Sequence, residues 1–506
     1  MKLRIVFTFI ALSLLGLACK KNEVIIDGKI SDKNIAKIEY TFPVNGIFNV
    51  LMADSIKPDE SGNFHIVIPF EKPGFILLRP VYQTMPAYKT QGIIISEPGK
   101  SYKVVFDTIN KESTFQVSGD NEDAINKYNK LQNPLLLSIS RELGPFLKDS
   151  VATSIREKII SQRDKEIAIF KDMFDKGKIS AGFLELIRTD RYCYYSEMTA
   201  QVISYKYSAS SRYPNMKFTK EQAELYKYKD DMKEIWEKGF QIPETLQADV
   251  ASSPWWFPYY KSFIYFKIFT NNDITPAGLQ ELGKKNLAKT FDINTGAKKY
   301  LPAHLLESYF ANYIYRECFL FGEIQDYELI TLYNQFISEY PNSKYTSYLT
   351  PWINHNIKYQ KKITESGYSE KIKFLDNYQD LNSLKNCVKS FQGKKVYIDV
   401  WATWCASCRS EFSKKEKLNE ILKSKGIEML YISMDEDKYD KTWKDLIKYY
   451  NLEGYHIRAN KPLSEDLKKI QNSGSGYYVP WHIMVDEEGK MMELPGDIAE
   501  LVKETK

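Results

Sequence analysis

Apolar and polar residues alternate in several short runs between positions 24 and 120. This spacing is typical of strands that bury one face, because successive side chains of a strand point to opposite sides. The clearest runs are Ile38, Tyr40 and Phe42, and then Phe64, Ile66, Ile68 and Phe70. Turn-forming residues at 59–63 and 96–100 interrupt the pattern. Residues 24–120 are therefore predicted to form an N-terminal antiparallel β domain, a sandwich or barrel of unknown role.

Residues 121–365 show helical spacing instead, together with many Lys and Glu residues. Prolines such as Pro243, Pro276 and Pro302 punctuate the segment, as expected between the helices of a bundle or solenoid. The cluster Trp255-Trp256-Phe257 is interpreted as helix packing, and a ligand groove is the alternative. The pattern predicts a central all-α domain over residues 121–365.

Residues 366–506 alternate between strand and helix patterns. The apolar run Val396–Trp401 suits a central strand that is buried on both faces. Trp443, Leu446, Ile447 and Tyr450 share one face of a helix. Trp481–Val485 is a strand pattern that runs into a turn and a partner strand. This βαβ…ββα order predicts a C-terminal α/β domain with a thioredoxin-like fold.

The first residues have the pattern of an export signal. Lys2 and Arg4 precede the apolar stretch Ile5–Leu17, which is too short to span a membrane as a helix. The Ala18-Cys19 junction that follows resembles a bacterial lipobox, in which the Cys becomes lipidated. The alternative is a plain secretory signal, since this chain has Gly16 where the lipobox usually has Leu.

The lipobox resemblance implies a signal peptide at 1–18 and a lipidated tether at 19–23. Cys19 would then hold the mature chain on a membrane surface without spanning it. The expected location is the cell envelope, with the protein lipid-anchored on the periplasmic side or at the outer membrane. Disulfides form and need managing in that compartment.

Composition narrows the possible partners. The chain has 506 residues, of which 43% are hydrophobic and 27% charged, so several folded domains are expected. The net charge is +5, or 5 − 2 = +3 once Lys2 and Arg4 leave with the leader. The sequence has no basic arm interleaved with aromatic residues, so no nucleic-acid partner is expected. Six cysteines in a chain of this length do not make a disulfide scaffold.

Residues 401–409, with the sequence WATWCASCR, join the predicted central strand to a helix and contain the pair Cys405 and Cys408. Zinc usually needs two such pairs and the sequence has one, so neither a metal nor a cofactor is expected. At a helix start, free N–H groups and the helix dipole stabilise a thiolate, so a low pKa is expected for Cys405. Cys405 is predicted to attack a substrate disulfide, and Cys408 to resolve the mixed disulfide.

The motif resembles the thioredoxin superfamily, and within it the membrane-anchored TlpA/ResA-like branch of Bacteroides-like bacteria. The resemblance covers roughly the last quarter of the chain and implies a thiol:disulfide oxidoreductase with Trp404 in its site. It also implies that Asp399 is a buried acid with a raised pKa that exchanges a proton with the resolving thiol. Glu411 matches a glutamate that tunes the site. The alternative for Asp399 is an exposed side chain at a strand edge, and the alternative for Glu411 is a solvated charge on a helix.

Val479-Pro480 precedes the last strand pattern, and the resemblance implies a cis proline that packs against the cysteine pair. The backbone of Val479 would then pair with extended substrate like an added strand. A trans proline in a loop is the alternative. His482 is interpreted as a strand residue, since thiol exchange needs no histidine. Three further cysteines are interpreted as buried, inert thiols: Cys193, Cys318 and Cys387.

The resulting hypothesis is a cell-envelope thiol:disulfide oxidoreductase that acts as a reductase on protein disulfides. Its partners would be those substrates and an upstream electron donor in the envelope. Ser407 stands where many thioredoxins have Pro, which leaves the redox potential and the direction open. The alternatives are a ligand- or partner-binding lipoprotein with an accessory thioredoxin module, and a thiol peroxidase. The peroxidase pattern Pro-x-x-x-Thr-x-x-Cys is absent around Cys405.

Overall fold

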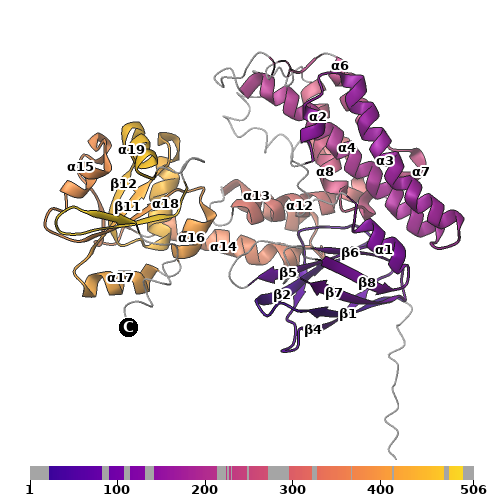
Figure 1. The fold of residues 1–506 in the computed structure, drawn as a ribbon, viewed down its shortest axis with the longest axis horizontal. Coiled ribbons are helices and arrows are strands. Elements are labelled where there is room, and N and C mark those ends of the chain that lie inside the picture. The colour runs from indigo at the N-terminus through magenta and orange to yellow at the C-terminus, as the bar shows by residue number, and fades with distance from the viewer. Residues whose placement is uncertain are drawn as a thin grey trace, which may run out of the picture. The chain divides into compact units, whose positions relative to one another are not determined.

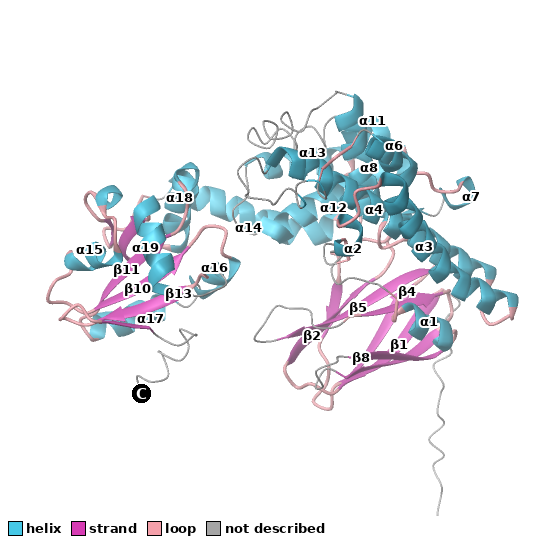
Figure 2. Ribbon diagram, turned by 45° about the horizontal axis from the view of Figure 1, so that its top comes forward, coloured by secondary structure: helices cyan, strands magenta, loops and turns pink. Residues whose placement is uncertain are grey.

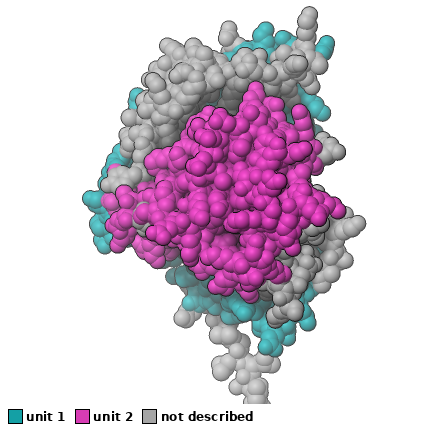
Figure 3. All heavy atoms as spheres, turned by 90° about the vertical axis from the view of Figure 1, so that its left-hand side faces the viewer, with its two compact units in different colours: residues 1–316, 335–349 teal, residues 317–334, 350–506 magenta. Residues whose placement is uncertain are grey.

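The chain forms two compact units, which Figure 3 colours separately. Unit 1 takes the residues up to 316 together with 335–349, and unit 2 takes 317–334 and the residues from 350 onward. The computed structural model describes residues 22–82, 91–107, 114–131, 142–212, 221, 224, 227–229, 231–247, 250–271, 296–321, 327–365, 367–412, 415–471 and 478–493. The predicted signal peptide and Cys19 lie outside these residues.

Unit 1 begins with eight strands in two four-stranded sheets. The strands are β1 (Glu23–Ile30), β2 (Ile35–Thr41), β3 (Asp54–Ile56), β4 (Asn63–Pro69), β5 (Gly74–Tyr82), β6 (Gly92–Ser96), β7 (Ser101–Asp107) and β8 (Thr114–Gly119). The sheet orders are β4-β1-β7-β8 and β3-β2-β5-β6. The second sheet is antiparallel throughout, whereas β1 pairs with β7 in parallel in the first. The predicted β domain is confirmed, with one parallel pair that the alternation of side chains does not reveal.

Burial along β4 follows the predicted alternation, because Phe64, Ile66 and Ile68 point inward and their neighbours are exposed. The strand core continues into the helices that follow it. Ile125 of α1 (Glu122–Tyr128) and Phe170 of α3 (Ala152–Asp175) belong to the same buried cluster as these strand residues. The strands and the first helices therefore share one hydrophobic core.

Helices make up most of the segment between residues 121 and 365, as predicted. They are α1 (Glu122–Tyr128), α2 (Gly144–Leu147), α3 (Ala152–Asp175), α4 (Ala181–Arg212), α6 (Asp231–Gly239), α7 (Glu244–Gln247), the 3-10 turn η2 (Val250–Ser252), α8 (Trp256–Asn271), α11 (Lys298–Tyr300), α12 (Ala303–Phe321), α13 (Tyr327–Glu339) and α14 (Thr346–Glu365). Figure 1 shows α3 and α4 as long helices that lie side by side. None of the described helices has both the length and the apolar character needed to cross a bilayer.

The aromatic cluster of the sequence is part of this packing. Trp255 and Trp256 are 3% and 0% exposed, and Tyr194 meets the ring of Trp255 edge-on at 4.9 Å. Trp256 donates its indole N–H to the carbonyl oxygen of Phe48, in the loop between β2 and β3. The interpretation as packing residues agrees with this burial.

In the described residues, unit 2 contains one six-stranded sheet with the order β14-β13-β10-β11-β12-β9, and Figure 2 labels its strands β10, β11 and β13. Its elements are β9 (Ile372–Phe374), η4 (Tyr378–Asp380), α15 (Leu384–Lys389), β10 (Val396–Trp401), α16 (Ala406–Phe412), α17 (Lys415–Ser424), β11 (Glu428–Ser433), η5 (Asp437–Tyr439), α18 (Asp440–Tyr450), β12 (Gly454–Arg458), α19 (Lys461–Gln471), β13 (Trp481–Val485) and β14 (Met491–Glu493). The strands β9, β12, β11 and β10 are parallel to one another, whereas β13 is antiparallel to β10 and β14 is antiparallel to β13. The predicted α/β fold is confirmed.

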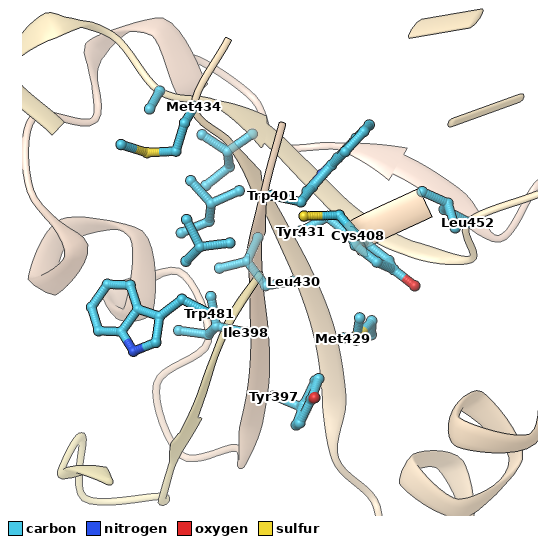
Figure 4. Close-up of a cluster of buried hydrophobic side chains, with 14 of the residues drawn as sticks. Tyr397, Ile398, Trp401, Cys408, Met429, Leu430, Tyr431, Met434, Leu452 and Trp481 are labelled. Carbon is cyan, nitrogen blue, oxygen red and sulfur yellow. The ribbon is translucent and has the colours of Figure 1, made fainter. Parts of the chain in front are cut away.

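The central strand β10 is buried at every position, as its apolar run predicts. Figure 4 shows Tyr397, Ile398 and Trp401 of β10 among the buried side chains that also include Cys408. The chain therefore leaves the middle of the core at the end of β10 and leads directly into the cysteine pair.

Candidate active site

The cysteine pair lies where β10 passes into α16. β10 ends at Trp401, and α16 begins at Ala406, directly after Cys405. The N–H of Cys405 donates to the carbonyl oxygen of Ala402 at 3.0 Å, and the N–H of Arg409 donates to that of Cys405 at 3.2 Å. Cys405 thus occupies the position immediately before the helix, as predicted.

A buried carboxylate from the neighbouring strand holds the loop that leads to Cys405. Asp435, just past β11, accepts the Thr403 N–H at 2.9 Å and the Thr403 hydroxyl at 2.7 Å. The hydroxyl of Ser433 donates to Asp435 at 2.6 Å. Burial raises the pKa of Asp435, and these hydrogen bonds partly offset the rise. The sequence analysis missed this carboxylate, because pairing of β10 with β11 is needed to bring it to the loop.

Cys405 and Cys408 form a disulfide. The N–H of Cys408, in the first turn of α16, donates to the Cys405 sulfur at 3.1 Å, and the Ser407 hydroxyl oxygen lies 3.3 Å from that sulfur. When the disulfide is reduced, these donors favour a thiolate on Cys405 rather than a thiol. The geometry therefore makes Cys405 the better nucleophile of the two.

The sulfur pair is mostly covered in the oxidised form. Cys405 is 5% exposed and Cys408 1% exposed, whereas the adjacent Trp404 is 56% exposed. Ala406 and Ser407 are exposed as well. A partner that approaches the pair therefore meets Trp404 and the exposed residues Ala406 and Ser407 at the start of α16.

Asp399 is buried as predicted, but the predicted charge state is wrong. It is 1% exposed and lies on β10, where the Nζ of Lys415 donates to its Oδ2. Burial by itself raises the pKa of this carboxyl, but the attraction of Lys415 and the contact with His482 outweigh burial and lower the pKa to about 2. Asp399 is thus an anion with its own cation, and it does not match the predicted buried acid with a raised pKa.

Glu411 lies on α16, one turn beyond Cys408. Its side chain is 18% exposed, and its Oε2 lies 3.1 Å from the Nε2 of His482. The alternative of a fully solvated helix charge does not fit this contact. Its part in tuning the site remains a prediction.

Besides Asp435, the sequence analysis missed Lys415, and it interpreted His482 only as a strand residue. His482 does lie on a strand, β13, where it is paired directly opposite Asp399 of β10. Its Nε2 is 3.5 Å from Oδ1 of Asp399. Lys415 begins α17 and is 2% exposed, although its charged neighbours in the sequence suggest a solvated helix face. The sequence gives only a weak indication that these two residues belong to the site. His482 lies two residues after Pro480, and Lys415 lies seven residues after Cys408.

The peptide bond between Val479 and Pro480 is cis, the geometry that the sequence analysis preferred. The residue before this pair, Tyr478, is 51% exposed. The side chain of Gln471 accepts the Tyr478 N–H at 2.9 Å and donates to the Tyr478 carbonyl oxygen at 3.0 Å. The pairing of the Val479 backbone with substrate stays a prediction.

The three other cysteines within the described residues are free and buried. Burial raises the pKa of Cys318 and of Cys387 to about 12, and it raises the pKa of Cys193 as well. Such thiols stay protonated and inert at neutral pH, in agreement with their interpretation. Within the described part of the chain, no group of His, Cys, Asp and Glu residues is arranged to hold a metal ion.

Comparison with known proteins assigns this domain. Residues 370–495 match the family model described as Redoxin. A thiol-disulfide oxidoreductase ResA of Bacillus thuringiensis subsp. konkukian is 28% identical over 137 residues, which cover 27% of this chain and 75% of the relative. A ResA of Bacillus cereus is 30% identical over 114 residues, which cover 22% of this chain and 61% of that relative.

Solved structures also match about a quarter of the chain. The thioredoxin domain of a thiol-disulfide oxidoreductase from Bacteroides vulgatus has 25% identity and a TM-score of 0.20, and covers 23% of this chain and 81% of that one. A thiol-disulfide oxidoreductase from Bacteroides fragilis has 25% identity and a TM-score of 0.20, and covers 23% of this chain and 84% of that one. On the sequence matches, unit 2 contains a ResA-like thiol-disulfide oxidoreductase domain with the pair Cys405 and Cys408.

Proposed function

We propose that this protein is a reductase of protein disulfides in the cell envelope. The Cys405–Cys408 pair, with the Cys408 N–H directed at the Cys405 sulfur, carries the proposal. In the reduced protein, the Cys405 thiolate attacks a substrate disulfide and forms a mixed disulfide, and the first substrate sulfur leaves as a thiolate. Cys408 then attacks Cys405, which restores the internal disulfide and releases the second substrate sulfur. Each turnover therefore consumes two electrons from a separate dithiol donor.

The exposed neighbours of the pair support a protein substrate. Trp404 and Tyr478 are both more than half exposed, and aromatic rings are common anchors for polypeptides. The segment Tyr478–Pro480 leads into β13 with its backbone held at Tyr478 by Gln471. An extended chain next to Val479 would place its own disulfide close to Cys405, like a strand added to the sheet.

Single cysteine variants test the exchange reaction. Cys405→Ser should abolish the acceleration that the protein gives to the reduction of insulin by dithiothreitol, because it removes the attacking sulfur. Cys408→Ser that is reduced first and then mixed with insulin without dithiothreitol should instead accumulate a mixed disulfide, because no second cysteine or free dithiol resolves it. Cys387→Ser, which changes a buried free thiol of the same unit, is the matched control and should keep full activity. Full activity in both CxxC variants would exclude the proposal.

The envelope location and the lipid anchor rest on the leader. Lys2, Arg4, the apolar stretch Ile5–Leu17 and Cys19 support export and lipidation. Bacteria that express the chain and are fed labelled palmitate should label it at Cys19, and the label should be lost in Cys19→Ser. An unlabelled wild-type chain in the soluble fraction would contradict the anchor.

A cavity in unit 1 favours ligand binding as a second candidate function. Its volume is about 460 Å³, within the usual range for small-molecule sites. The lining includes Lys72, Glu185 and Glu307, so both signs of charge face a molecule bound there. This lining suits a small zwitterion such as an amino acid or dipeptide. A panel of dipeptides should raise the melting temperature of the wild-type chain but not of Glu185→Gln/Glu307→Gln, and the absence of any shift would remove this candidate.

A further inference from the structure

Four ionisable side chains from four elements of unit 2 form one connected group next to the cysteine helix. Asp399 lies on β10, Glu411 on α16, Lys415 at the start of α17 and His482 on β13. Asp399, Lys415 and His482 are 1%, 2% and 4% exposed. Lys415 donates to one oxygen of Asp399, and His482 lies 3.5 Å from the other. His482 also lies 3.1 Å from Glu411, so it connects the two carboxylates.

The strand register places His482 at this point. β13 is antiparallel to β10, with His482 directly opposite Asp399. His482 is also two residues after the cis proline, and Glu411 is three residues after Cys408 on the same helix face. The imidazole therefore joins the strand that follows Pro480 to the helix that carries Cys408.

The charges of this group balance only when His482 is protonated. Asp399 and Glu411 supply two negative charges, and Lys415 supplies one positive charge. A neutral imidazole would leave an uncompensated negative charge in a buried place, which is costly. Burial alone lowers the pKa of His482, but the two carboxylates outweigh it and raise the pKa to about 9.

Two phenols pack against this group in the described residues, one on His482 and one on Lys415. The ring of Tyr397, on β10, stacks on the imidazole with centroids 5.8 Å apart. Tyr431, on β11, lies beneath the ammonium of Lys415 at 5.2 Å from ring centroid to Nζ. Burial raises the pKa of both phenols, so they remain protonated. Asp399 and Glu411 are thus the anions that His482 meets.

The two carboxylates differ in their freedom to take up a proton. Asp399 is held by two cations and is closed off from solvent. Glu411 meets one cation and keeps 18% of its side chain exposed, so a proton can enter and leave there. The sequence analysis expected Asp399 to exchange the proton of the resolving thiol, and this difference between the two carboxylates favours Glu411 instead.

We propose that His482 is a positioning residue for disulfide exchange, which fixes the side chain of Glu411 on the helix that carries Cys408 and, together with Lys415, pairs with Asp399, so that the proton of Cys408 passes to Glu411 and not to Asp399. This inference rests on the proposed exchange at Cys405 and Cys408.

The step balances in atoms and electrons. The Cys408 thiol gives its proton to the Glu411 carboxylate, directly or through one water, and becomes a thiolate. The thiolate attacks the Cys405 sulfur of the mixed disulfide, so the Cys405–Cys408 bond forms and the bond to the substrate breaks. The substrate sulfur leaves as a thiolate and receives the proton from Glu411 through solvent. The cysteine pair is oxidised and the substrate is reduced.

A small aromatic disulfide separates the two halves of the reaction. Reduced whole chain mixed with dithiobisnitrobenzoate releases one thionitrobenzoate when Cys405 attacks and a second when Cys408 resolves. The second release therefore reports proton loss from Cys408. The signal of Cys405→Ser/Cys408→Ser, measured in parallel, corrects for the other thiols of the chain.

His482→Gln should move the apparent pKa of the second release upward by about one unit, because the loss of a positive charge close to the cysteine helix disfavours the thiolate form of Cys408. The first release should stay unchanged. Glu411→Gln should slow the second release by about 100-fold at neutral pH. His456→Gln, which changes a buried histidine of β12 that contacts the carbonyl oxygen of Leu452, is the matched control and should leave both releases unchanged.

Asp399→Asn/Lys415→Met removes the buried pair together and avoids an unpaired buried charge. This double variant should keep the second release within about three-fold of the wild type at every pH, since Asp399 is not the acceptor. A 100-fold loss in this variant, with normal kinetics in Glu411→Gln and His482→Gln, would overturn the inference. If the wild-type chain showed no first release of thionitrobenzoate, that result would instead contradict the proposed exchange reaction at Cys405.

Discussion

Asp399 shows how the neighbours of a single residue decide its chemistry. It lies six residues before Cys405 in a buried strand, and burial alone favours the neutral acid. Lys415 and His482 reverse that preference because both bring positive charge to the same carboxylate. A buried acid next to a CxxC pair is therefore not a proton acceptor by position alone.

The charged state of His482 predicts a pH-dependent stability of unit 2. Its folded pKa is raised to about 9, above the ordinary value of 6.5, so the folded state holds a proton that the unfolded state releases. The stabilisation is complete below pH 6.5 and is lost as the pH rises through about 9. Urea unfolding of the whole chain between pH 6 and 10, followed by tryptophan fluorescence, should show this loss as at most about 3 kcal/mol.

His482→Gln should lack this alkaline loss. His456→Gln is the matched control, because burial lowers the pKa of His456 to about 4 and its effect has the opposite sign. That stabilisation is present above pH 6.5 and declines as the pH falls toward 4, so His456→Gln should alter only the acid side. If His482→Gln kept the same loss of unfolding free energy at alkaline pH, that result would contradict the protonated state of His482.

The hydroxyl of Thr403 should stabilise the loop before Cys405. Thr403→Val removes its 2.7 Å hydrogen bond and leaves an oxygen of the buried Asp435 poorly paired, which costs about 1–3 kcal/mol. Hydrogen–deuterium exchange of peptides covering residues 401–412 should become faster. Thr403→Ser keeps the hydroxyl and should retain wild-type protection, and equal exchange in the two variants would argue against the anchor.

At the scale of elements, the two strands that pair with β10 both bring residues to the site. It pairs with β11, which ends near Asp435, and with β13, which carries His482. α16 then starts directly at the cysteine pair and brings Glu411 to the imidazole. The order of strands in the sheet, rather than their order in the chain, gathers these residues.

The start of β12 needs a glycine for a steric reason. Gly454 has a φ of 138°, and a Cβ there would come within 2.8 Å of the Met429 carbonyl oxygen on β11. Gly454→Ala should therefore destabilise unit 2 by about 2–3 kcal/mol in urea unfolding. Gly426→Ala is the control, since Gly426 also has a positive φ of 65° but has free space around the added carbon. It should cost only about 1 kcal/mol, and an equal cost at both positions would contradict the role of the close approach.

At the scale of the whole molecule, the sheets and the first helices of unit 1 share one core, and three of these helices also share a buried charge network. Arg191 on α4 is fully buried and donates to Asp190 at 2.5 Å and to Glu166 on α3 at 3.2 Å. Tyr128 of α1 donates to the same Asp190 at 2.6 Å. The network therefore ties three helices of unit 1 together, and none of its members belongs to the cysteine site.

Breaking this network should destabilise unit 1 without impairing the chemistry of unit 2. Arg191→Met leaves Asp190 and Glu166 without their buried cation, which costs about 3–5 kcal/mol. Calorimetry of the whole chain should show an earlier transition for unit 1, while the rate of insulin reduction stays at the wild-type value. Arg163→Met is the control, since Arg163 pairs with the mostly exposed Asp164 and should cost less than about 1 kcal/mol. A parallel loss of exchange activity would contradict the independence of the two units.

Much of the fold follows from local patterns. The alternation in Phe64–Phe70, the buried run of β10 and the helix face of Trp443 and Leu446 each predicted an element that the structure contains. The same patterns did not distinguish the parallel pairing of β1 with β7, because side chains alternate equally in both arrangements. The CxxC pair and Val479-Pro480 were found as sequence motifs, and the structure forms the disulfide and the cis peptide there.

By itself, the sequence determined the element types, the pair Cys405 and Cys408 and the position of Cys405 before a helix, because spacing along the chain sets all of these. Only the tertiary structure decided the charge of Asp399 and the part of Lys415, His482 and Asp435. These groups meet through strand register and helix packing across up to 83 positions of sequence, from 399 to 482. The electrostatic energy depends on the distance in space between these charged groups and on their burial, and the spacing of residues along the chain determines neither.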